Sequence, residues 1–164
     1  MFNLKKDRLK FTDKAKQIVE QMSLEEKVYL MSGRINPFDM GDAFNHPSAD
    51  KHYNVFPYPA GGNERLAIPE MKFCDGPRGV VCHRATCFPV TMARGATFDE
   101  KLEEQVGEAI AREIRAFGGN FFGGVCINLP YNPGWGRSQE VYGEDTFHLG
   151  RMGSAQIGRA SCRE

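Results

Sequence analysis

The sequence carries no surplus of charge of either sign. Its 164 residues include 21 Lys and Arg and 21 Asp and Glu, so the formal net charge at neutral pH is zero. A protein that binds nucleic acid mainly through phosphates carries an excess of basic residues, so nucleic acid is excluded as the main partner. Long apolar runs are also missing, and no stretch reaches the roughly 20 residues of a membrane-spanning helix. With 41% hydrophobic and 26% charged residues, the composition predicts a soluble globular domain without a membrane partner.

Motifs for metal, nucleotide or serine chemistry are absent as well. The five cysteines are irregularly spaced and form no C-x-x-C pair, which argues against a disulfide framework or a four-ligand zinc site. Cys82, His83 and Cys87 could form a metal clip, but reduced thiols are the favoured interpretation. The P-loop, a complete G-x-G-x-x-G, the G-x-S-x-G elbow and H-E-x-x-H are all missing. The first residues lack the apolar core of a secretory signal, which favours a cytoplasmic location.

The N-terminal third of the chain predicts two helices followed by a long loop. Apolar residues recur at helical spacing over residues 13–22. Ser23 then begins S-L-E-E, a capping box that starts a second helix, and Gly33 is placed to end it. Residues 34–63 are rich in Pro, Gly, Asn and aromatic residues and show no periodicity, which predicts a loop that lines a pocket or wraps the body.

The rest of the chain alternates strands and helices. Residues 71–74 predict a strand, T-F-D-E at residues 97–100 opens a long helix, residues 120–129 predict a second strand, and a last helix starts near Asp145. This order is typical of a parallel α/β fold. In such folds the ligand binds where the strands end at their carboxyl edge. Both polar, glycine-rich loops of this chain follow a predicted strand and so belong to that edge.

These two loops contain the candidate ligand-binding residues. The first, C-D-G-P-R-G, carries the carboxylate of Asp75 and the guanidinium of Arg78 on a turn stiffened by proline. The second, N-P-G-W-G-R-S-Q-E, carries Trp135, Arg137 and Glu140. An aromatic face beside carboxylate and guanidinium groups suits a sugar, whose C–H patches stack on rings while its hydroxyls pair with the charged groups.

Each of these residues also has a structural interpretation. Asp75 can serve as a turn or capping residue, Trp135 can pack in the interior, and Arg137 with Glu140 can form an ion pair. The acidic residues 144–145 are typical of a helix N-terminus, where the helix dipole favours negative charge. The residues alone therefore indicate an α/β enzyme with a polar ligand site.

Four blocks resemble the N-terminal domain of family 3 glycoside hydrolases, most closely its bacterial β-glucosidase and β-xylosidase branch. They are M-S-L-E-E-K-V, C-D-G-P-R-G-V, A-T-C-F-P-V-T-M-A-R-G-A-T-F-D and N-P-G-W-G-R-S-Q-E-V-Y-G-E-D, and they match in order and spacing over residues 13–156. The resemblance implies an α/β fold that is part of a (β/α)₈ TIM-type barrel, with only the first two or three βα units present. Residues 1–33 are then an N-terminal helical segment and residues 34–156 the start of the barrel domain. Residues 157–164, which read as a translated sequencing adapter, are predicted to be a cloning or sequencing scar.

The resemblance also implies roles for individual residues. Asp75 and Arg137 are implied to bind hydroxyls of the sugar in the first subsite, and Glu140 to brace its loop. Val81 and Gly134 depart from the arginines that many relatives carry there, which leaves secondary contacts open. Retaining hydrolysis needs two carboxyl groups about 5–5.5 Å apart, and the nucleophile and acid/base of relatives have no matching position here.

Taken together, the residues and the resemblance predict part of a retaining, exo-acting β-glycosidase of the β-glucosidase type. Its partner is a small β-glycoside or oligosaccharide, it needs no cofactor or metal, and the chain by itself is expected to be inactive. A non-catalytic sugar-binding module that uses Asp75, Trp135 and Arg137 is the alternative. A phosphate-binding α/β enzyme is disfavoured by the zero net charge and the missing phosphate loop. Neither glucose over xylose nor an oligomeric state is indicated.

Overall fold

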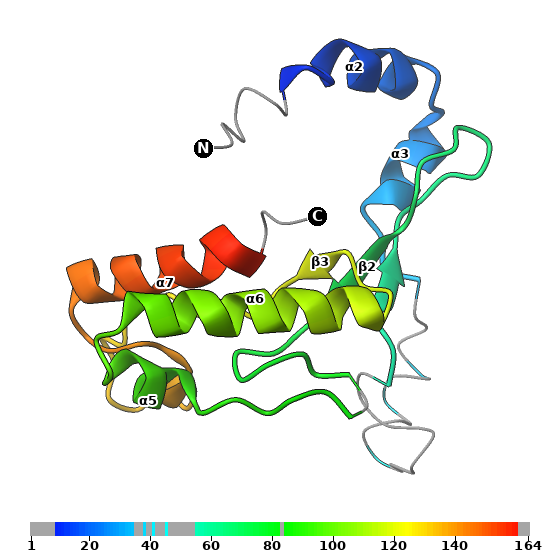
Figure 1. Ribbon diagram of the computed structural model, residues 1–164. Coiled ribbons are helices and arrows are strands. Elements are labelled where there is room, and N and C mark those ends of the chain that lie inside the picture. Colours follow the sequence, from blue (N-terminus) through cyan, green and yellow to red (C-terminus); the bar gives the residue numbers. More distant parts are fainter. Residues whose placement is uncertain are drawn as a thin grey trace. The chain divides into compact units, whose positions relative to one another are not determined.

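The computed structural model describes residues 9–34, 55–82 and 84–160, together with positions 38, 41 and 45. The chain divides into two compact units, whose elements are labelled in Figure 1. The first unit takes in the chain up to Arg34 together with Pro59–Met71, and the second takes in the remainder. Residues 59–71 thus group with the N-terminal helices by their contacts, and the predicted domain bounds stay a prediction.

The first unit begins with two short helices, α2 (Thr12–Glu20) and α3 (Leu24–Leu30). The predicted capping box is confirmed: the Ser23 hydroxyl accepts from the Glu26 amide at 3.2 Å, and the Glu26 carboxylate accepts from the Ser23 amide at 2.9 Å. Both helices end earlier than expected. α3 stops at Leu30, ahead of Gly33, because Gly33 forms an isolated antiparallel bridge with Ala60 instead of a helix cap.

Glu26 also ties α3 to the segment that follows β1. Its carboxylate accepts from the Asn63 amide at 2.9 Å and from Arg65 Nε at 2.9 Å and Nη2 at 2.6 Å. Asn63 in turn forms a bridge with Ile68 that closes a tight loop. The hydrogen bonds from Arg65, then Asn63 and the Ser23 amide, lower the pKa of Glu26 to about 2. One carboxylate therefore caps a helix and holds this loop.

We expect Glu26→Gln to destabilise the first unit in a pH-dependent way. The pKa of Glu26 is about 2 in the folded chain against an ordinary value of 4.5, so ionisation favours folding at any pH above 4.5. The urea midpoint of the variant, followed by circular dichroism, should lie below wild type at pH 7. The gap should close as pH falls from about 4.5 towards 2. Glu20→Gln, on the exposed end of α2, is the control, and a constant gap at every pH would contradict the prediction.

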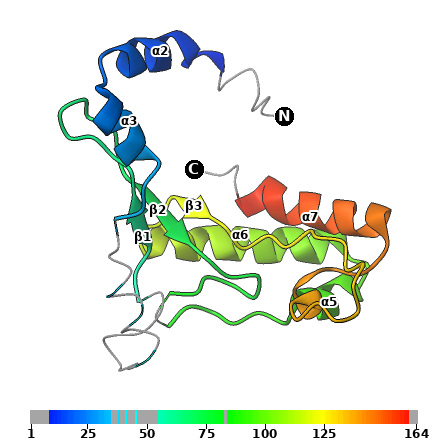
Figure 2. The same cartoon turned by 180° about the vertical axis from the view of Figure 1, so that it is seen from behind.

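The strands β1 (Tyr58–Ala60), β2 (Met71–Cys74) and β3 (Phe121–Phe122) form one sheet in the order β1-β2-β3. β2 has the predicted bounds, and it pairs with β3 in parallel, as expected (Figure 2). Phe73 lies opposite Phe121 in this register. The parallel pairing sets the carboxyl ends of β2 and β3 at the same edge.

β3 is much shorter than the strand predicted over residues 120–129. The two glycines that follow Phe122 explain the difference. Gly123 still donates its amide to the Cys74 carbonyl at 2.8 Å, but a Cβ on Gly124 would lie only 2.2 Å from the Gly76 carbonyl oxygen. The chain leaves the ladder here because it runs against the turn that follows β2.

Among the described residues of the second unit, the α-helices with defined bounds are α5 (Thr91–Gly95), α6 (Glu100–Ala116) and α7 (Thr146–Ala160). α6 starts where expected, because the Asp99 side chain accepts from the amides of Lys101 and Leu102 at 2.9 and 3.0 Å. α5 was not expected. α7 begins next to Asp145, as predicted, and continues into the segment interpreted as a scar, whose origin stays a prediction.

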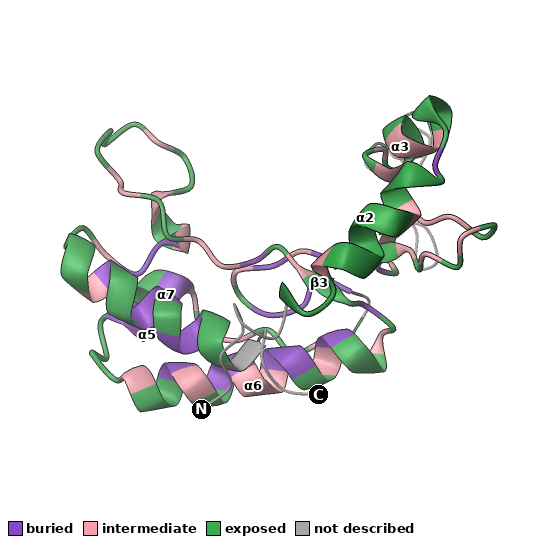
Figure 3. Ribbon diagram, turned by 90° about the horizontal axis from the view of Figure 1, so that it is seen from above, coloured by how far each residue is buried: buried purple, intermediate pink, exposed green. Residues whose placement is uncertain are grey.

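The core of the second unit is formed by the end of β2, the segment that follows it and one face of α6. It contains Cys74, Val80, Cys82, Val106, Ile110 and Ile114. α6 and α7 run side by side, with the buried residues of α6 on the side towards α7 (Figure 3). Gly107 allows this approach, since a Cβ there would meet the Gln156 carbonyl at 2.8 Å. Among the described residues, no helix is both long and apolar enough to cross a bilayer.

Candidate active site at the strand ends

The candidate site lies where the carboxyl ends of β2 and β3 meet. Asp75 follows the last residue of β2 directly and is half-buried. Its side chain accepts from the Gly76 amide at 2.8 Å, and its carbonyl accepts from the Val81 amide at 2.9 Å. Gly76 and Gly79 both have positive φ, 127° and 119°, so the turn needs glycine at these positions. The turn thereby holds the Asp75 carboxylate at the edge of the sheet.

Arg137 and Glu140 form an ion pair on the loop that follows β3. Arg137 Nε lies 2.9 Å from each carboxylate oxygen of Glu140, and Nη2 also contacts Oε2. The short 3₁₀ helix η1 (Ser138–Glu140) creates this spacing. The structural interpretation of the pair is therefore confirmed. Arg137 is exposed, whereas Glu140 is mostly covered, so Glu140 holds the guanidinium from below and leaves its outer face accessible.

Asp75 and Arg137 lie within electrostatic reach of each other. The hydrogen bonds that Arg137 donates to Glu140 raise the pKa of Arg137 most, and the Asp75 carboxylate adds to that increase. Asp75 also raises the pKa of Cys126, whose thiol donates to Glu140 Oε2 at 3.6 Å. A carboxylate and a guanidinium from two loops far apart in the sequence thus lie within electrostatic range of each other.

The surroundings of Cys126 and Glu140 limit what each group can do in catalysis. Burial, followed by the neighbouring Glu140, raises the pKa of the Cys126 thiol, which keeps it protonated and poorly nucleophilic. The hydrogen bond from Arg137 lowers the pKa of Glu140, which keeps that carboxylate ionised and unable to protonate a leaving group. Cys126 is therefore a poor nucleophile and Glu140 a poor general acid.

The remaining predicted residues have less defined places. Arg78 is exposed on the Asp75 turn, where its carbonyl accepts from the Phe88 amide at 2.7 Å. Trp135 is half-buried on the Arg137 loop. Their roles towards a ligand stay predictions. The possible metal clip depends on His83, which lies outside the described residues, and the residues that are described contain no cluster suited to a metal ion.

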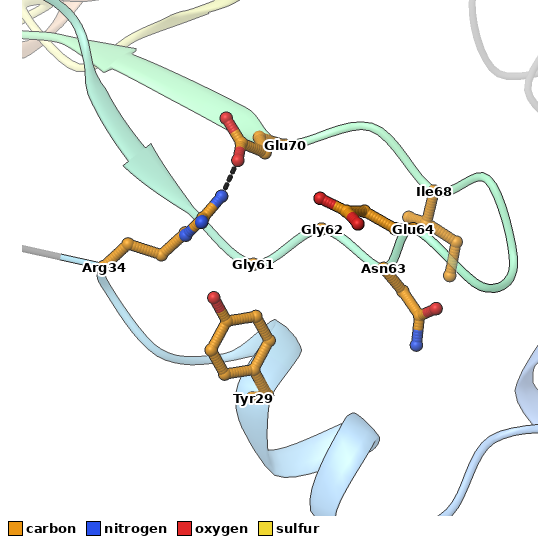
Figure 4. Close-up of a pocket in the computed structure, with 8 residues that line it drawn as sticks. All are labelled: Tyr29, Arg34, Gly61, Gly62, Asn63, Glu64, Ile68 and Glu70. Carbon is orange, nitrogen blue, oxygen red and sulfur yellow. Dashed lines mark ion pairs between the residues drawn. The ribbon is translucent and has the colours of Figure 1, made fainter.

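A separate hollow of about 310 Å³ lies in the first unit (Figure 4). Part of its lining comes from residues 34–63, the segment predicted to line a pocket or wrap the body. Its residues are Tyr29, Arg34, Gly61, Gly62, Asn63, Glu64, Ile68 and Glu70. Arg34 and Glu70 form an ion pair with each other, and the Asn63 amide donates to Glu26. These three polar groups therefore already have protein partners.

Sequence reasoning missed two buried charged residues behind the site, Arg94 on α5 and Glu103 on α6. Both side chains are at least 97% buried. A signal was present: Glu103 shares the apolar face of α6 with Val106 and Ile110, at spacings of three and seven. A carboxylate on an apolar stripe indicates a buried partner, although the sequence does not show which one.

Residues 42–159 match the glycosyl hydrolase family 3 N terminal domain. The chain belongs to glycosyl hydrolase family 3. The family 3 match includes both loops of the candidate site, so the turn at Asp75 and the loop at Arg137 are part of the family's own domain.

Curated relatives of this family 3 chain are β-glucosidases by name. The probable β-glucosidase J of Aspergillus fumigatus is 35% identical over 135 residues, which are 79% of this chain and 13% of that protein. A β-glucosidase of Rhizobium radiobacter is 32% identical over 135 residues, 78% of this chain and 14% of that protein. The chain thus spans only 13–14% of the length of these two relatives.

Solved structures agree on the fold. β-Glucosidase 3B from Thermotoga neapolitana, in complex with α-D-glucose, has a TM-score of 0.74 and 28% identity, covering 90% of this chain and 21% of that chain. The family 3 β-glucosidase of Bifidobacterium adolescentis has a TM-score of 0.67 and 27% identity, covering 87% and 18%. The predicted fold class is confirmed: the chain forms part of the barrel-type α/β domain of family 3.

Proposed function

We propose that the strand-end site binds the terminal sugar of a β-glucoside and that the full-length gene product is a retaining, exo-acting β-glucosidase. The observation that carries this proposal is the Asp75 carboxylate within electrostatic reach of Arg137 at the carboxyl edge of parallel strands. Ligands of such folds bind at that edge. The names of the relatives, and the glucose bound to the Thermotoga neapolitana enzyme, support the sugar class.

The two charged groups suit different parts of a sugar. A carboxylate accepts hydrogen bonds from two neighbouring hydroxyls, and a guanidinium donates to hydroxyl oxygens. Glu140 engages Nε and Nη2 of Arg137, so Nη1 is the nitrogen that can donate to a ligand. Because Glu140 pins the long Arg137 side chain beforehand, less conformational entropy is lost when a sugar binds.

The described residues of the site supply binding and not bond cleavage. Retaining hydrolysis requires one carboxylate to attack and one protonated carboxyl to release the leaving group. Asp75 is assigned to the hydroxyls, and the lowered pKa of Glu140 keeps that group ionised. We therefore assign the nucleophile and the acid/base to residues outside this chain, and the 164-residue chain by itself is expected to be inactive.

The test is hydrolysis of 4-nitrophenyl β-D-glucopyranoside by the full-length gene product and by the 164-residue chain. We expect nitrophenol release by the first only, with β-glucose as the first product in proton NMR. Vigorous release by the 164-residue chain would overturn the division of roles. Glucose binding in calorimetry without any release by the full-length product would favour the non-catalytic sugar-binding module.

A further inference from the structure

A buried polar network joins the two loops of the candidate site from behind. Arg94 Nη2 donates to the Pro77 carbonyl at 2.6 Å, and Pro77 lies two residues after Asp75 in the first loop. Arg94 Nη1 lies 3.2 Å from Glu103 Oε1. The Tyr142 hydroxyl, two residues after Glu140 on the second loop, lies 2.6 Å from the same oxygen.

Helix α5 sits between these loops in direct contact with both. Thr91 donates its hydroxyl to the Pro77 carbonyl at 3.3 Å. At the other end of the helix a Cβ on Gly95 would lie 2.0 Å from the Tyr142 carbonyl oxygen. The Arg94 guanidinium also lies 5.9 Å from the centre of the Tyr142 ring, within cation–π range. One short helix therefore fixes the backbone of one loop and the aromatic ring of the other.

The charges of the buried network add little to the stability of the fold. Burial raises the pKa of Glu103 even though the Tyr142 hydroxyl and Arg94 oppose that change. Arg94 Nε, Glu103 Oε2 and the Gln156 amide nitrogen have no hydrogen-bond partner. Well-packed apolar residues often replace such a buried pair without loss of stability. Such a replacement would leave the Pro77 carbonyl with only the Thr91 hydroxyl at 3.3 Å, and the Tyr142 hydroxyl with only Gln156 Oε1 at 2.7 Å.

We propose that Arg94 and Glu103 are positioning residues that set the separation of Asp75 and Arg137 across the sugar site. Arg94 anchors the Asp75 turn through Pro77, Glu103 anchors the Arg137 loop through Tyr142, and the ion pair couples the two anchors. The inference rests on the proposed function, because it concerns the geometry in which those two groups grip a sugar. Displacement by about 1 Å is enough to weaken such a grip strongly.

The deciding variant is Arg94→Met/Glu103→Leu in the full-length gene product. It removes both charges together, so neither is left buried and unpaired, and we expect it to fold with a melting temperature close to wild type. We expect kcat/KM for 4-nitrophenyl β-D-glucopyranoside to fall about 30-fold, mostly through KM, because the binding groups move apart while the reacting groups stay. The single variant Arg94→Lys keeps a donor near Pro77, so its kcat/KM should fall less than that of the double variant.

A matched double variant on α6 is the control. Arg112→Met/Glu108→Leu removes an exposed ion pair of α6 with an N–O distance of 2.7 Å and should leave KM and kcat unchanged. A folded Arg94→Met/Glu103→Leu protein with wild-type KM would overturn the proposal. If that variant fails to fold, Tyr142→Phe removes only the second anchor, and a wild-type KM there would overturn it equally.

A second readout separates this inference from the proposed function. Hydrogen exchange of the Val81 amide, which donates to the Asp75 carbonyl at 2.9 Å, reports on the Asp75 turn without any substrate. We expect at least tenfold faster exchange in Arg94→Met/Glu103→Leu than in the control. If the wild-type full-length product hydrolyses no glucoside while exchange is still faster in Arg94→Met/Glu103→Leu, only the proposed function is refuted. If exchange is unchanged in that variant, the positioning role is refuted.

Discussion

Asp75→Asn in the full-length gene product is expected to lower kcat/KM for a β-glucoside by about 10³-fold. Hydrogen bonds to a charged group contribute about 1.5–3 kcal/mol each, and a carboxylate that grips two hydroxyls makes two of them. The asparagine amide keeps one acceptor and puts an NH₂ donor towards Arg137. The substitution is nearly isosteric, so the loss measures chemistry and not volume.

This change also separates the two interpretations of Asp75. Asparagine is as good a turn residue as aspartate, and its side-chain oxygen can still accept from the Gly76 amide, as Asp75 does at 2.8 Å. A residue needed only for the turn would therefore tolerate Asp75→Asn. Steady-state kinetics with a nitrophenyl glucoside, beside a thermal melt, gives the answer, and nearly unchanged kcat/KM in a folded variant would refute sugar binding by Asp75.

Asp99→Asn is the matched control for that experiment. It makes the same chemical change at the N-cap of α6, where the side chain accepts from two backbone amides. Asparagine caps helices as well as aspartate does, so both stability and kcat/KM should stay close to wild type. A comparable loss of activity in this variant would show that the assay responds to net charge and not to the site.

Gly76→Ala is expected to abolish the turn that carries Asp75. Gly76 has φ of 127°, and a Cβ there would lie 1.8 Å from the Gly79 carbonyl oxygen and 2.7 Å from Val81 Cγ2. The backbone strain alone costs about 1–3 kcal/mol, and relief of the clash requires the turn to open, for a total of about 3 kcal/mol or more. Thermal melting should shift down strongly, and glucoside hydrolysis by the full-length gene product should be lost.

Gly136→Ala is the control on the second loop, because a Cβ there would meet nothing within 4 Å. The two variants are compared by urea unfolding of the 164-residue chain, followed by the fluorescence of Trp135, its single tryptophan. Equal midpoints for Gly76→Ala and Gly136→Ala would contradict the steric role of Gly76. A lower urea midpoint in both variants would show that alanine destabilises either loop regardless of a steric clash.

Elements that depend on near neighbours were predicted well. The capping box of Ser23 and the cap of Asp99 both use hydrogen bonds between residues two or three positions apart. The strand at residues 71–74 has the predicted bounds, since it is a short apolar run that stops at a turn. The strand, helix, strand rhythm also predicted the parallel pairing of β2 and β3.

Elements that depend on distant neighbours were predicted poorly. β3 is shortened because Gly124 meets the backbone of the turn after β2, a contact invisible in the local apolar pattern of residues 120–129. α5 is too short to show helical periodicity. Arg94 and Glu103 were passed over because a charged residue on a helix is read as exposed unless its partner is known.

The sequence by itself determined the order of β2, α6, β3 and α7, the capping of α3 and α6, and the two polar loops placed at strand ends. These features follow from backbone preferences and from hydrogen bonds a few residues long. Only the tertiary structure decided that Arg94 reaches the Pro77 carbonyl 17 residues away and that Asp75 comes within electrostatic reach of Arg137. Such contacts form only when tertiary packing of the second unit brings distant segments together, and no local pattern encodes them.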